Sequence, residues 1–485
     1  MWGSLIADSG HKSDAMGLKR RHIERVVLAV IVLFGLYLRL TLLAGTTIDT
    51  PFRSDARQYT AYAYNLKQHG VYSNNFNAIN NPDKTPAPDA FRSPGYPLFL
   101  YPFTNAKSMV RFAINVFYAQ ALLSAMTIAA VYVLSRIIIG GIGGLVAAFL
   151  TAASPHLINL NIYLLTETVF TFFLVSGIVV LILAVQTENK SALILSGLIL
   201  AFATLVKPTL QYYLIFLIGF FFIQSGIKHR LSVCLLIVVP FTTVFSIWLI
   251  RNMITLGYPT DPSLAINTIH HGMYPHFMFN GDPRTFGFPY RFDPHSKEIA
   301  RSMGSVLSAT FNRFLTRPAD HIVWFLSKPF YLFRWDMIQG IGTFIYPVQQ
   351  TPYQTSVFFA VVYQTMRIIH PILILLSWIG ALLCWLPEKW LKMDQAVVIP
   401  VRLLSLVYLY FVLVHVAGAP FPRYSIPLRP ITYVLAMTPF FLFITGLMKK
   451  NDQHDAKRFE KDFGSHLCMK LINEGNDVLC IDNLK

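Results

Sequence analysis

Long apolar stretches without a charged residue constrain this sequence more than any other feature. Residues 26–38 and 231–250 contain no Asp, Glu, Lys or Arg, and each lies within a longer apolar run. About 20 residues of α-helix are needed to cross the roughly 30 Å hydrocarbon layer of a bilayer. Backbone polar groups have no water partner in lipid, so a spanning segment must satisfy them internally, as a helix does. These runs therefore predict an all-α polytopic membrane protein.

The composition supports this prediction. Of 485 residues, 54% are hydrophobic and only 13% are charged, whereas soluble proteins carry roughly 25% charged residues. The net charge of +16 would suggest nucleic acid in a soluble protein. In a membrane protein, Lys and Arg instead collect in short cytoplasmic segments and near anionic lipid headgroups. We therefore expect the lipid bilayer as a partner and no nucleic acid.

The apolar segments predict about ten transmembrane helices. The predicted spans are residues 26–45, 111–135, 137–155, 163–185, 192–206, 211–226, 230–250, 357–386, 397–418 and 430–448. In a ten-span topology, flanking basic residues such as Arg20, Arg136, Lys228 and Lys449 all fall on one side. Because cytoplasmic flanks are enriched in Lys and Arg, this side is predicted to be the cytoplasm.

This topology divides the chain into three parts. We expect a cytoplasmic N-terminal segment (1–25), a membrane domain (26–448) and a cytoplasmic tail (449–485). Within the membrane domain, two large hydrophilic loops, 46–110 and 251–356, fall on the extracytoplasmic side. Long loops of this kind often carry function.

One aromatic segment of the second loop, residues 321–337, is amphipathic. We expect it to lie as a helix in the outer membrane interface.

Two carboxylates are placed where they could take part in chemistry. Asp55 lies about ten residues beyond the first span, with Tyr59, Tyr62 and Leu66 following at helical spacing. It is either the N-cap of a short helix or a general base that faces a cavity at the membrane surface. Glu167 lies near the outer end of the fourth span, where a carboxylate is costly unless it meets a cation, protein or water. Glu167 either takes part in the function of the protein or forms a structural ion pair.

Two cationic positions run against the positive-inside trend. Lys207 follows the fifth span, and Arg423 precedes Tyr424 in the loop between the ninth and tenth spans. Such side chains either extend toward the headgroups or bind an anion, for example a lipid phosphate.

Histidines form a third candidate group. His270 and His271 lie in the second outer loop, near His276 and Asp282. Histidines close to acidic residues can bind a divalent metal. This spacing matches no standard ligand set, and loop histidines without a metal are more common.

Taken in order, these motifs resemble the C-type glycosyltransferase superfamily. After the first-loop acid come RSPGYPLFL (92–100), LTE (165–167), VKP (206–208) and PRYSIPLRP (422–430). The nearer resemblance is to the bacterial branch related to dolichyl-phosphate-mannose protein mannosyltransferases and to the aminoarabinose transferase of lipid A. It extends over roughly residues 26–448.

The resemblance implies an enzyme that moves a monosaccharide from a polyprenyl-phosphate donor to an acceptor outside the bacterial cytoplasmic membrane. The acceptor would be a protein, lipid A or an envelope glycan. Asp55 would be the catalytic base, and Lys207, Arg423 and Tyr424 would bind the donor phosphate. Glu167, His270 and His271 would line the cavity, contact the acceptor or hold a metal. The alternatives are a polymerase or ligase that uses lipid-linked oligosaccharide, and a lipid-sugar flippase or transporter.

The tail carries a separate resemblance. Residues 464–485 resemble the start of an NAD-dependent sugar-nucleotide epimerase or decarboxylase, with Asp482 at the ribose-binding position. The preceding strand and most of the glycine fingerprint are missing from the sequence. We therefore expect a non-functional remnant that binds no cofactor.

Overall fold

The computed structural model describes residues 3–81, 83–387, 391 and 394–442. Six helices in this part of the chain are long and apolar enough to cross a membrane. They are the Arg20–Gly45 part of α1 (Gly3–Gly45), α4 (Met109–Ala153), α6 (Glu167–Thr187), α9 (Arg230–Leu256), α15 (Val357–Leu383) and α17 (Gln395–Ala417). The predicted all-α polytopic membrane fold is confirmed.

Helix α4 consists of two arms that reverse direction at a glycine. A straight helix of 45 residues would be about 67 Å long at 1.5 Å per residue, which is twice the hydrocarbon thickness. Gly140 interrupts it with φ 75° and ψ −179°, a conformation that glycine adopts without a Cβ clash. Arg39 of α1 donates both to Ser124 Oγ and to the carbonyl of Ala152, at 2.7 and 3.0 Å. Both arms therefore lie against α1, and they correspond to two separate predicted spans.

Two further apolar helices are shorter. Helix α7 (Lys190–Val206) has 17 residues and α8 (Tyr213–Ile223) has 11. A helix of the length of α8 covers only about 16 Å, so it is too short to cross the hydrocarbon layer alone. The last predicted span begins as helix over residues 429–442. Its remainder, and the tail for which we predicted no cofactor binding, lie outside the described residues.

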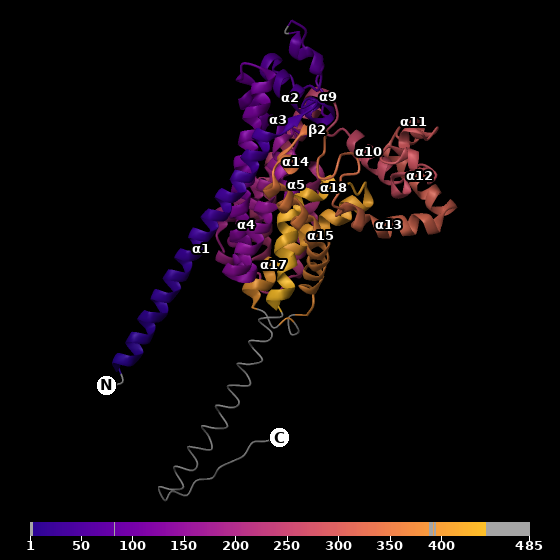
Figure 1. Ribbon diagram of the computed structural model, residues 1–485. Helices are drawn as coiled ribbons and strands as arrows, with labels where there is room; N and C mark the ends of the chain where they lie inside the picture. The colour runs from indigo at the N-terminus through magenta and orange to yellow at the C-terminus, as the bar shows by residue number, and fades with distance from the viewer. Residues whose placement is uncertain (1–2, 82, 388–390, 392–393, 443–485) are drawn as a thin grey trace, which may run out of the picture.

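The predicted outer loops contain short helices and a small ribbon, gathered at one end of the bundle (Figure 1). Strand β1 (Thr47–Ile48) pairs antiparallel with β2 (Val348–Gln350), so the start of the first loop is joined to the end of the second. The short elements at or near this end are α2 (Ser54–His69), η1 (Phe76–Asn80), α3 (Gly95–Leu100), η2 (Tyr101–Asn105), α5 (Pro155–Asn159), η3 (Leu160–Ile162), η4 (Pro208–Leu210), α14 (Pro352–Thr355), α18 (Pro422–Ser425) and η8 (Ile426–Leu428).

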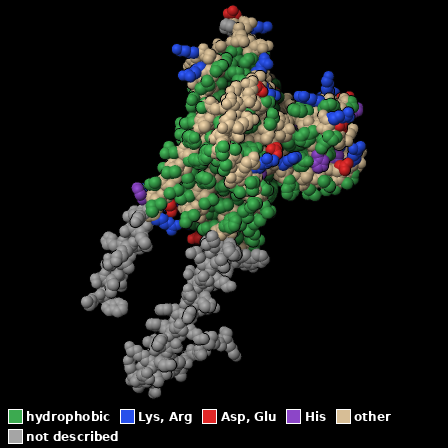
Figure 2. Space-filling model, viewed as in Figure 1, with side chains coloured by type: hydrophobic (Ala, Val, Ile, Leu, Met, Phe, Trp, Pro, Cys, Tyr) green, Lys and Arg blue, Asp and Glu red, His purple; other side chains and the backbone are tan. Residues whose placement is uncertain are grey.

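The middle of the second loop forms a lobe that projects sideways from the bundle (Figure 1). The lobe contains α10 (Ser263–Gly272), η5 (Pro275–Phe277), η6 (Pro283–Thr285), η7 (Pro289–Arg291), α11 (Ser296–Ile299), α12 (Met303–Thr316) and α13 (Pro318–Leu332). Exposed apolar side chains follow one another at helical spacing on α12 and α13, including Phe311, Leu315, Leu326 and Phe330. Figure 2 shows hydrophobic side chains over the bundle flank, and charged ones toward both ends of the bundle and on the lobe. Helix α13 covers most of the segment predicted to lie in the membrane interface.

The lobe is fastened to the bundle next to α18. Within the lobe, Trp324 Nε1 of α13 donates to the carbonyl of Gly272 at the end of α10, at 2.8 Å. Lys328, which is fully buried, donates to the carbonyls of Val416 and Gly418 at 2.8 and 2.9 Å. A Cβ at Gly272 would lie only 2.1 Å from the Gly418 oxygen, so the end of α10 and the turn after α17 require glycine here.

Candidate functional site

The first turn of α2 presents Asp55 to two arginines. The N-cap of this helix is Arg53, whose side chain makes no capping hydrogen bond, so the alternative that Asp55 is an N-cap is wrong. Its Oδ1 accepts from Arg92 Nη2 at 2.7 Å, and its Oδ2 accepts from Arg423 Nη1 at 2.9 Å. Both carboxylate oxygens are therefore held by guanidinium groups that come from distant segments.

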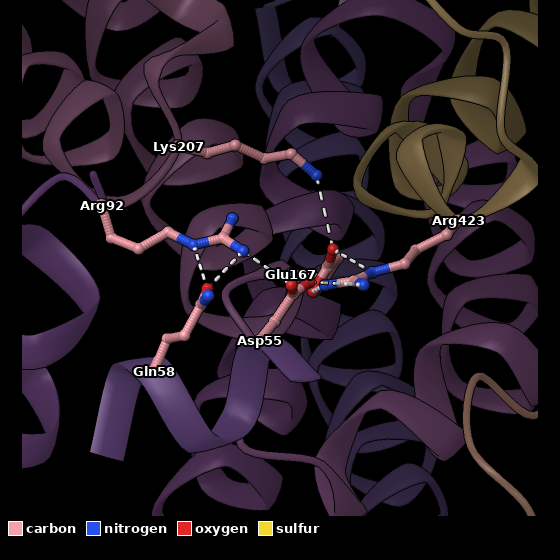
Figure 3. Close-up of polar contacts among 6 residues, drawn as sticks. All are labelled: Asp55, Gln58, Arg92, Glu167, Lys207 and Arg423. Atoms are coloured by element: carbon pink, nitrogen blue, oxygen red, sulfur yellow. Dashed lines mark hydrogen bonds and ion pairs between the residues drawn. The ribbon is translucent and has the colours of Figure 1, made fainter. Parts of the chain in front are cut away.

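Glu167 begins α6, and its carboxylate is buried against two cations (Figure 3). Its Oε1 accepts from Arg423 Nε at 2.8 Å and from Lys207 Nζ at 3.4 Å. Such pairing is what a carboxylate at this depth requires, because an unpaired buried charge is strongly disfavoured. Arg423 thus bridges Glu167 and Asp55.

Prolines and glycines position the cationic residues. Arg423 follows Pro422, which opens the short helix α18, where proline is tolerated because the first helical N–H has no intrahelical partner. Arg92 precedes the Pro94–Gly95 turn, and a Cβ at Gly95 would lie 2.4 Å from the backbone nitrogen of Val206. This close approach brings the segment that carries Arg92 against the end of α7, immediately before Lys207.

Gln58, one turn along α2 from Asp55, fixes the orientation of Arg92. Its Oε1 accepts from Arg92 Nε at 2.9 Å and from Nη2 at 2.7 Å. The Arg92 guanidinium also lies over the ring of Tyr59, 5.3 Å from its centroid, an arrangement that favours a cation. Arg92 is therefore held rigidly beside Asp55 (Figure 3).

The cluster is electrostatically positive. Three cations, Arg92, Lys207 and Arg423, face the two carboxylates of Asp55 and Glu167. Burial alone would raise the pKa of Asp55, but Arg92 and Arg423 outweigh burial and lower this pKa to about 2. Burial would lower the pKa of Arg423, but Glu167 and Asp55 together hold it well above its usual range. Asp55 and Arg423 are therefore charged at neutral pH. By formal charge, the three basic side chains outnumber the two carboxylates by one.

Lys207 and Tyr424 lie on one side of the cluster. The Lys207 Nζ is 5.0 Å from the centroid of the Tyr424 ring, within the range of a cation–π interaction. Tyr424 also packs against the ring of His415, 5.1 Å away. An aromatic wall thus excludes water on this side of the Lys207–Glu167 pair.

A cavity of about 270 Å³ adjoins the cluster. It lies between α2, the end of the second loop and α18. Its lining includes Arg53, Ser54, Asp55, His271, Tyr290, Gln339, Tyr346, Arg423 and Tyr424. Two members of the ion-pair cluster thus face a space in which a small polar ligand could bind; we call this space the site cavity.

The two adjacent histidines of α10 point to different surroundings. His271 lines the site cavity, and its Nε2 contacts the carbonyl of Gly287 at 2.8 Å. Burial lowers its pKa to about 4, so this ring is neutral at pH 7. His270 instead contacts the hydroxyl of Tyr274 at 3.0 Å, and burial also lowers its pKa.

The structure does not bring the metal candidates together. The part of the chain that it describes contains no group of three or more His, Cys, Asp or Glu side chains able to hold a metal ion. Glu167 is instead satisfied by Arg423 and Lys207, while His270 and His271 lie on different faces of α10. The arrangement of Glu167, His270 and His271 therefore offers no ready metal site.

Of the residues named from the sequence, Asp55, Glu167, Lys207 and Arg423 form one connected cluster, and Tyr424 and His271 lie next to it. Our sequence reasoning missed Arg92, Gln58 and Tyr346. The available signal for Arg92 was its position: it is a charged residue immediately before a Pro–Gly turn of an outer loop.

Residues 94–250 match the family described as dolichyl-phosphate-mannose-protein mannosyltransferase. The match covers 157 of the 485 residues, so about a third of the chain is similar to this mannosyltransferase family. The matched region contains Glu167 and Lys207, whereas Asp55, Arg92 and Arg423 lie outside it. No curated protein matches this sequence.

Solved structures from Archaeoglobus fulgidus are similar in fold. The oligosaccharyltransferase AglB, in complex with an inhibitory peptide and a dolichol-phosphate, is 14% identical, with a TM-score of 0.45. The alignment covers 91% of this chain and 52% of that one. The oligosaccharyltransferase of the same organism in complex with Zn and sulfate is also 14% identical, with a TM-score of 0.44, over 86% of this chain and 51% of the other. The chain thus spans about half the length of these oligosaccharyltransferases.

Proposed function

We propose that this protein is a glycosyltransferase that moves a monosaccharide from a polyprenyl-phosphate donor to an acceptor on the outer face of a bacterial cytoplasmic membrane. One observation carries the proposal: three half-buried cations surround two carboxylates beside a cavity. A sugar phosphate that enters there finds positive charge for its phosphate and a base for the attacking hydroxyl.

The basic residues of the opposite end support this orientation. Arg20 precedes the apolar part of α1, Arg136 lies near the Gly140 reversal of α4, and Lys228 lies between α8 and α9. These positions are at the other ends of the helices from the cluster. Because positive flanks favour the cytoplasm, the cluster would face outward. Residues 26–448 would then form the catalytic membrane domain, between cytoplasmic segments 1–25 and 449–485.

In the proposed reaction, the acceptor hydroxyl attacks the anomeric carbon of the donor sugar. Asp55 takes the hydroxyl proton, the anomeric carbon–oxygen bond breaks, and polyprenyl phosphate leaves with the bonding electrons. Lys207 and Arg423 would neutralise the charge on the departing phosphate, with Tyr424 beside them. Attack opposite to the leaving group inverts the anomeric centre. The acceptor would be a protein, lipid A or an envelope glycan.

The resting ion pairs add a condition to this mechanism. A carboxylate whose pKa is about 2 is a weak base. The donor phosphate competes with Asp55 for Arg423, and transfer of Arg423 to the phosphate frees Oδ2 of Asp55. Loss of this partner raises the pKa of Asp55 and strengthens it as a base. Binding of the donor would thereby activate the catalytic residue.

The test is Asp55→Asn in the purified full-length chain. The amide keeps the size of the side chain but cannot accept the proton, so we expect transfer to fall by about 10²- to 10⁴-fold. Donor lipids that carry one sugar and several sugars are compared in the same assay, because a polymerase or ligase would require the longer donor. A flippase would move the lipid into the opposite leaflet of liposomes without forming a covalent product.

The matched control is Asp55→Glu, which keeps the charge. Partial activity in this variant, together with unchanged membrane insertion of both variants, would assign the loss to the chemistry. Full activity of Asp55→Asn would remove Asp55 from the mechanism.

A further inference from the structure

The lobe contains a second and larger cavity, of about 610 Å³. We call it the lobe cavity. It lies between the segment that follows α10 and the junction of α12 with α13. The lining side chains used below are Tyr274, His276, Phe279, Asn280, Asp293, Arg313, Arg317, Asp320 and His321. None of these residues lines the site cavity, so the two spaces are separate.

One buried group of the lobe cavity has no partner. The side chain of His321 is 4% exposed, and its Nδ1 contacts the carbonyl of Arg317 at 2.9 Å. A ring nitrogen that contacts a carbonyl must donate, which leaves Nε2 of the neutral ring as an acceptor. This Nε2 has no hydrogen-bond partner within the described ranges. Nε2 has almost no accessible surface, so a ligand hydroxyl reaches it only when the ring shifts toward the cavity. Because an unsatisfied buried acceptor is costly, such a hydroxyl would be stabilised there.

The charges of the lobe cavity balance. Arg313 pairs with Asp293, and Arg317 lies in the same wall as Asp320. Two guanidinium groups therefore match two carboxylates, in contrast to the cation excess around Asp55. A phosphate would gain little net attraction here. An uncharged ligand with several hydroxyl groups fits this mixture of donors and acceptors better, and the half-buried ring of Phe279 offers an apolar surface beside them.

The backbone of this wall is held in an uncommon conformation. His276, Phe277 and Asn280 have φ values of 54°, 58° and 51°. They are three of the six non-glycine residues with positive φ in the described ranges. Left-handed conformations of this kind cost of order 1–3 kcal/mol each and persist where the surroundings hold them, often at ligand sites.

Helix α10 connects the two cavities. His271, near its end, lines the site cavity, whereas Tyr274, three residues later, lines the lobe cavity. The Tyr274 hydroxyl donates to Asp293 at 2.6 Å and contacts His270 at 3.0 Å. A ligand in the lobe cavity would thus lie about one helical turn along the chain from the wall of the site cavity.

We propose that the lobe cavity binds a neutral saccharide unit of the acceptor, with the Nε2 of His321 accepting a sugar hydroxyl. The identification of this saccharide as part of the acceptor rests on the proposed glycosyl transfer. The binding of a saccharide by the lobe can be measured without any transfer.

The experiment uses saturation-transfer difference NMR on the purified full-length chain in detergent. The probes are the methyl glycosides of glucose, galactose, mannose and N-acetylglucosamine. We expect at least one probe to receive magnetisation from the wild type. His321→Asn keeps an amide donor near the Arg317 carbonyl but removes the Nε2 position, so we expect about fivefold to tenfold weaker binding, as for the loss of one hydrogen bond. His321→Gln returns a polar atom near the Nε2 position, so it should bind more tightly than His321→Asn.

The Asp55→Asn variant separates this proposal from the catalytic one. It should bind the same glycoside as the wild type while failing to transfer sugar. Binding that survives in His321→Asn but is lost in Asp55→Asn would locate the saccharide in the site cavity and overturn the proposal. The proposal would also be overturned if no glycoside received magnetisation from the protein, or if only sn-glycerol 1-phosphate, used as a probe for a lipid headgroup, received it. Neither result would affect the role of Asp55, which the activity assay tests.

Discussion

The two ion-pair clusters of this protein are assembled in different ways. In the lobe, Asp293 and Arg313 are 20 residues apart, and the carboxylate also accepts from Tyr274 and from the backbone N–H of His295. At the end of the bundle, Arg423 binds Asp55 and Glu167, which are 368 and 256 residues away. The lobe cluster is local and neutral, whereas the bundle cluster joins distant segments and keeps an extra cation. An anion would gain more net attraction at the second cluster than at the first, which is the basis of the proposed donor site.

Among the substitutions that test this comparison, Arg423→Met is expected to have the largest effect on activity and stability. The change leaves Asp55 with one cationic partner and Glu167 with Lys207 alone. We expect kcat/KM for transfer to fall by about 10²- to 10³-fold, as when a charge-stabilising group is removed. Thermal unfolding of the purified protein should also shift down, because breaking a buried ion pair costs about 3–5 kcal/mol. Arg423→Lys keeps the charge but lacks the guanidinium geometry that bridges two carboxylates. Full activity of Arg423→Lys would show that this bridging is not needed for transfer.

A smaller but more diagnostic effect is expected from Arg92→Met. Arg92 is one of the two cations that lower the pKa of Asp55 to about 2. Without it, this pKa should rise by about 1–3 units, so Asp55 becomes protonated at a higher pH. The acid limb of the pH dependence of kcat/KM should therefore move from near pH 2 to about pH 3–5, in measurements that extend from pH 2 to 8. Arg92→Lys should leave the limb nearly in place. An unchanged limb in Arg92→Met would show that Asp55 is not the titrating base.

The lobe cluster gives a local effect. Asp293→Asn weakens the bonds to Arg313 and Tyr274. We therefore expect the free energy of local opening of this region to fall by about 1–3 kcal/mol. Hydrogen–deuterium exchange should increase in peptides from residues 293–316. Donor affinity should change by less than about twofold, because the donor contacts belong to the other cluster. A large loss of donor affinity would mean that the two clusters act as one.

The smallest effect is expected at an exposed pair. Arg284 and Asp282 form a salt bridge of 2.7 Å on the lobe surface, and the Arg284 side chain is 88% exposed. Surface pairs of this kind contribute little to stability, because water and salt screen them. Arg284→Ala should leave the unfolding temperature and the transfer rate unchanged, which makes it a control for the three substitutions above.

Several candidate site residues could be recognised from the sequence because they oppose a general trend. Glu167 lies in an apolar run, and the predicted topology puts Lys207 and Arg423 on the side where cations are disfavoured. Such positions carry a cost that a partner must offset. The identity of that partner could not be predicted, because Arg423 reaches Asp55 across 368 residues and the local sequence contains no trace of this contact.

The helical architecture followed from hydropathy, but its details depended on tertiary contacts. The two spans on either side of Gly140 were visible as separate apolar runs, whereas their joint packing on α1 through Arg39 was not. His270 and His271 are neighbours in the sequence and looked like one candidate site. Successive residues of a helix point about 100° apart, so the two rings enter different environments.

The β1–β2 ribbon has a mechanical consequence. Thr47 pairs with Gln350 and Ile48 with Val348. The start of the first outer loop, a few residues before Asp55, is therefore joined to the end of the second outer loop. Movement of α2 away from this end of the bundle would therefore be resisted by the β1–β2 pairing, because the two strands would have to separate.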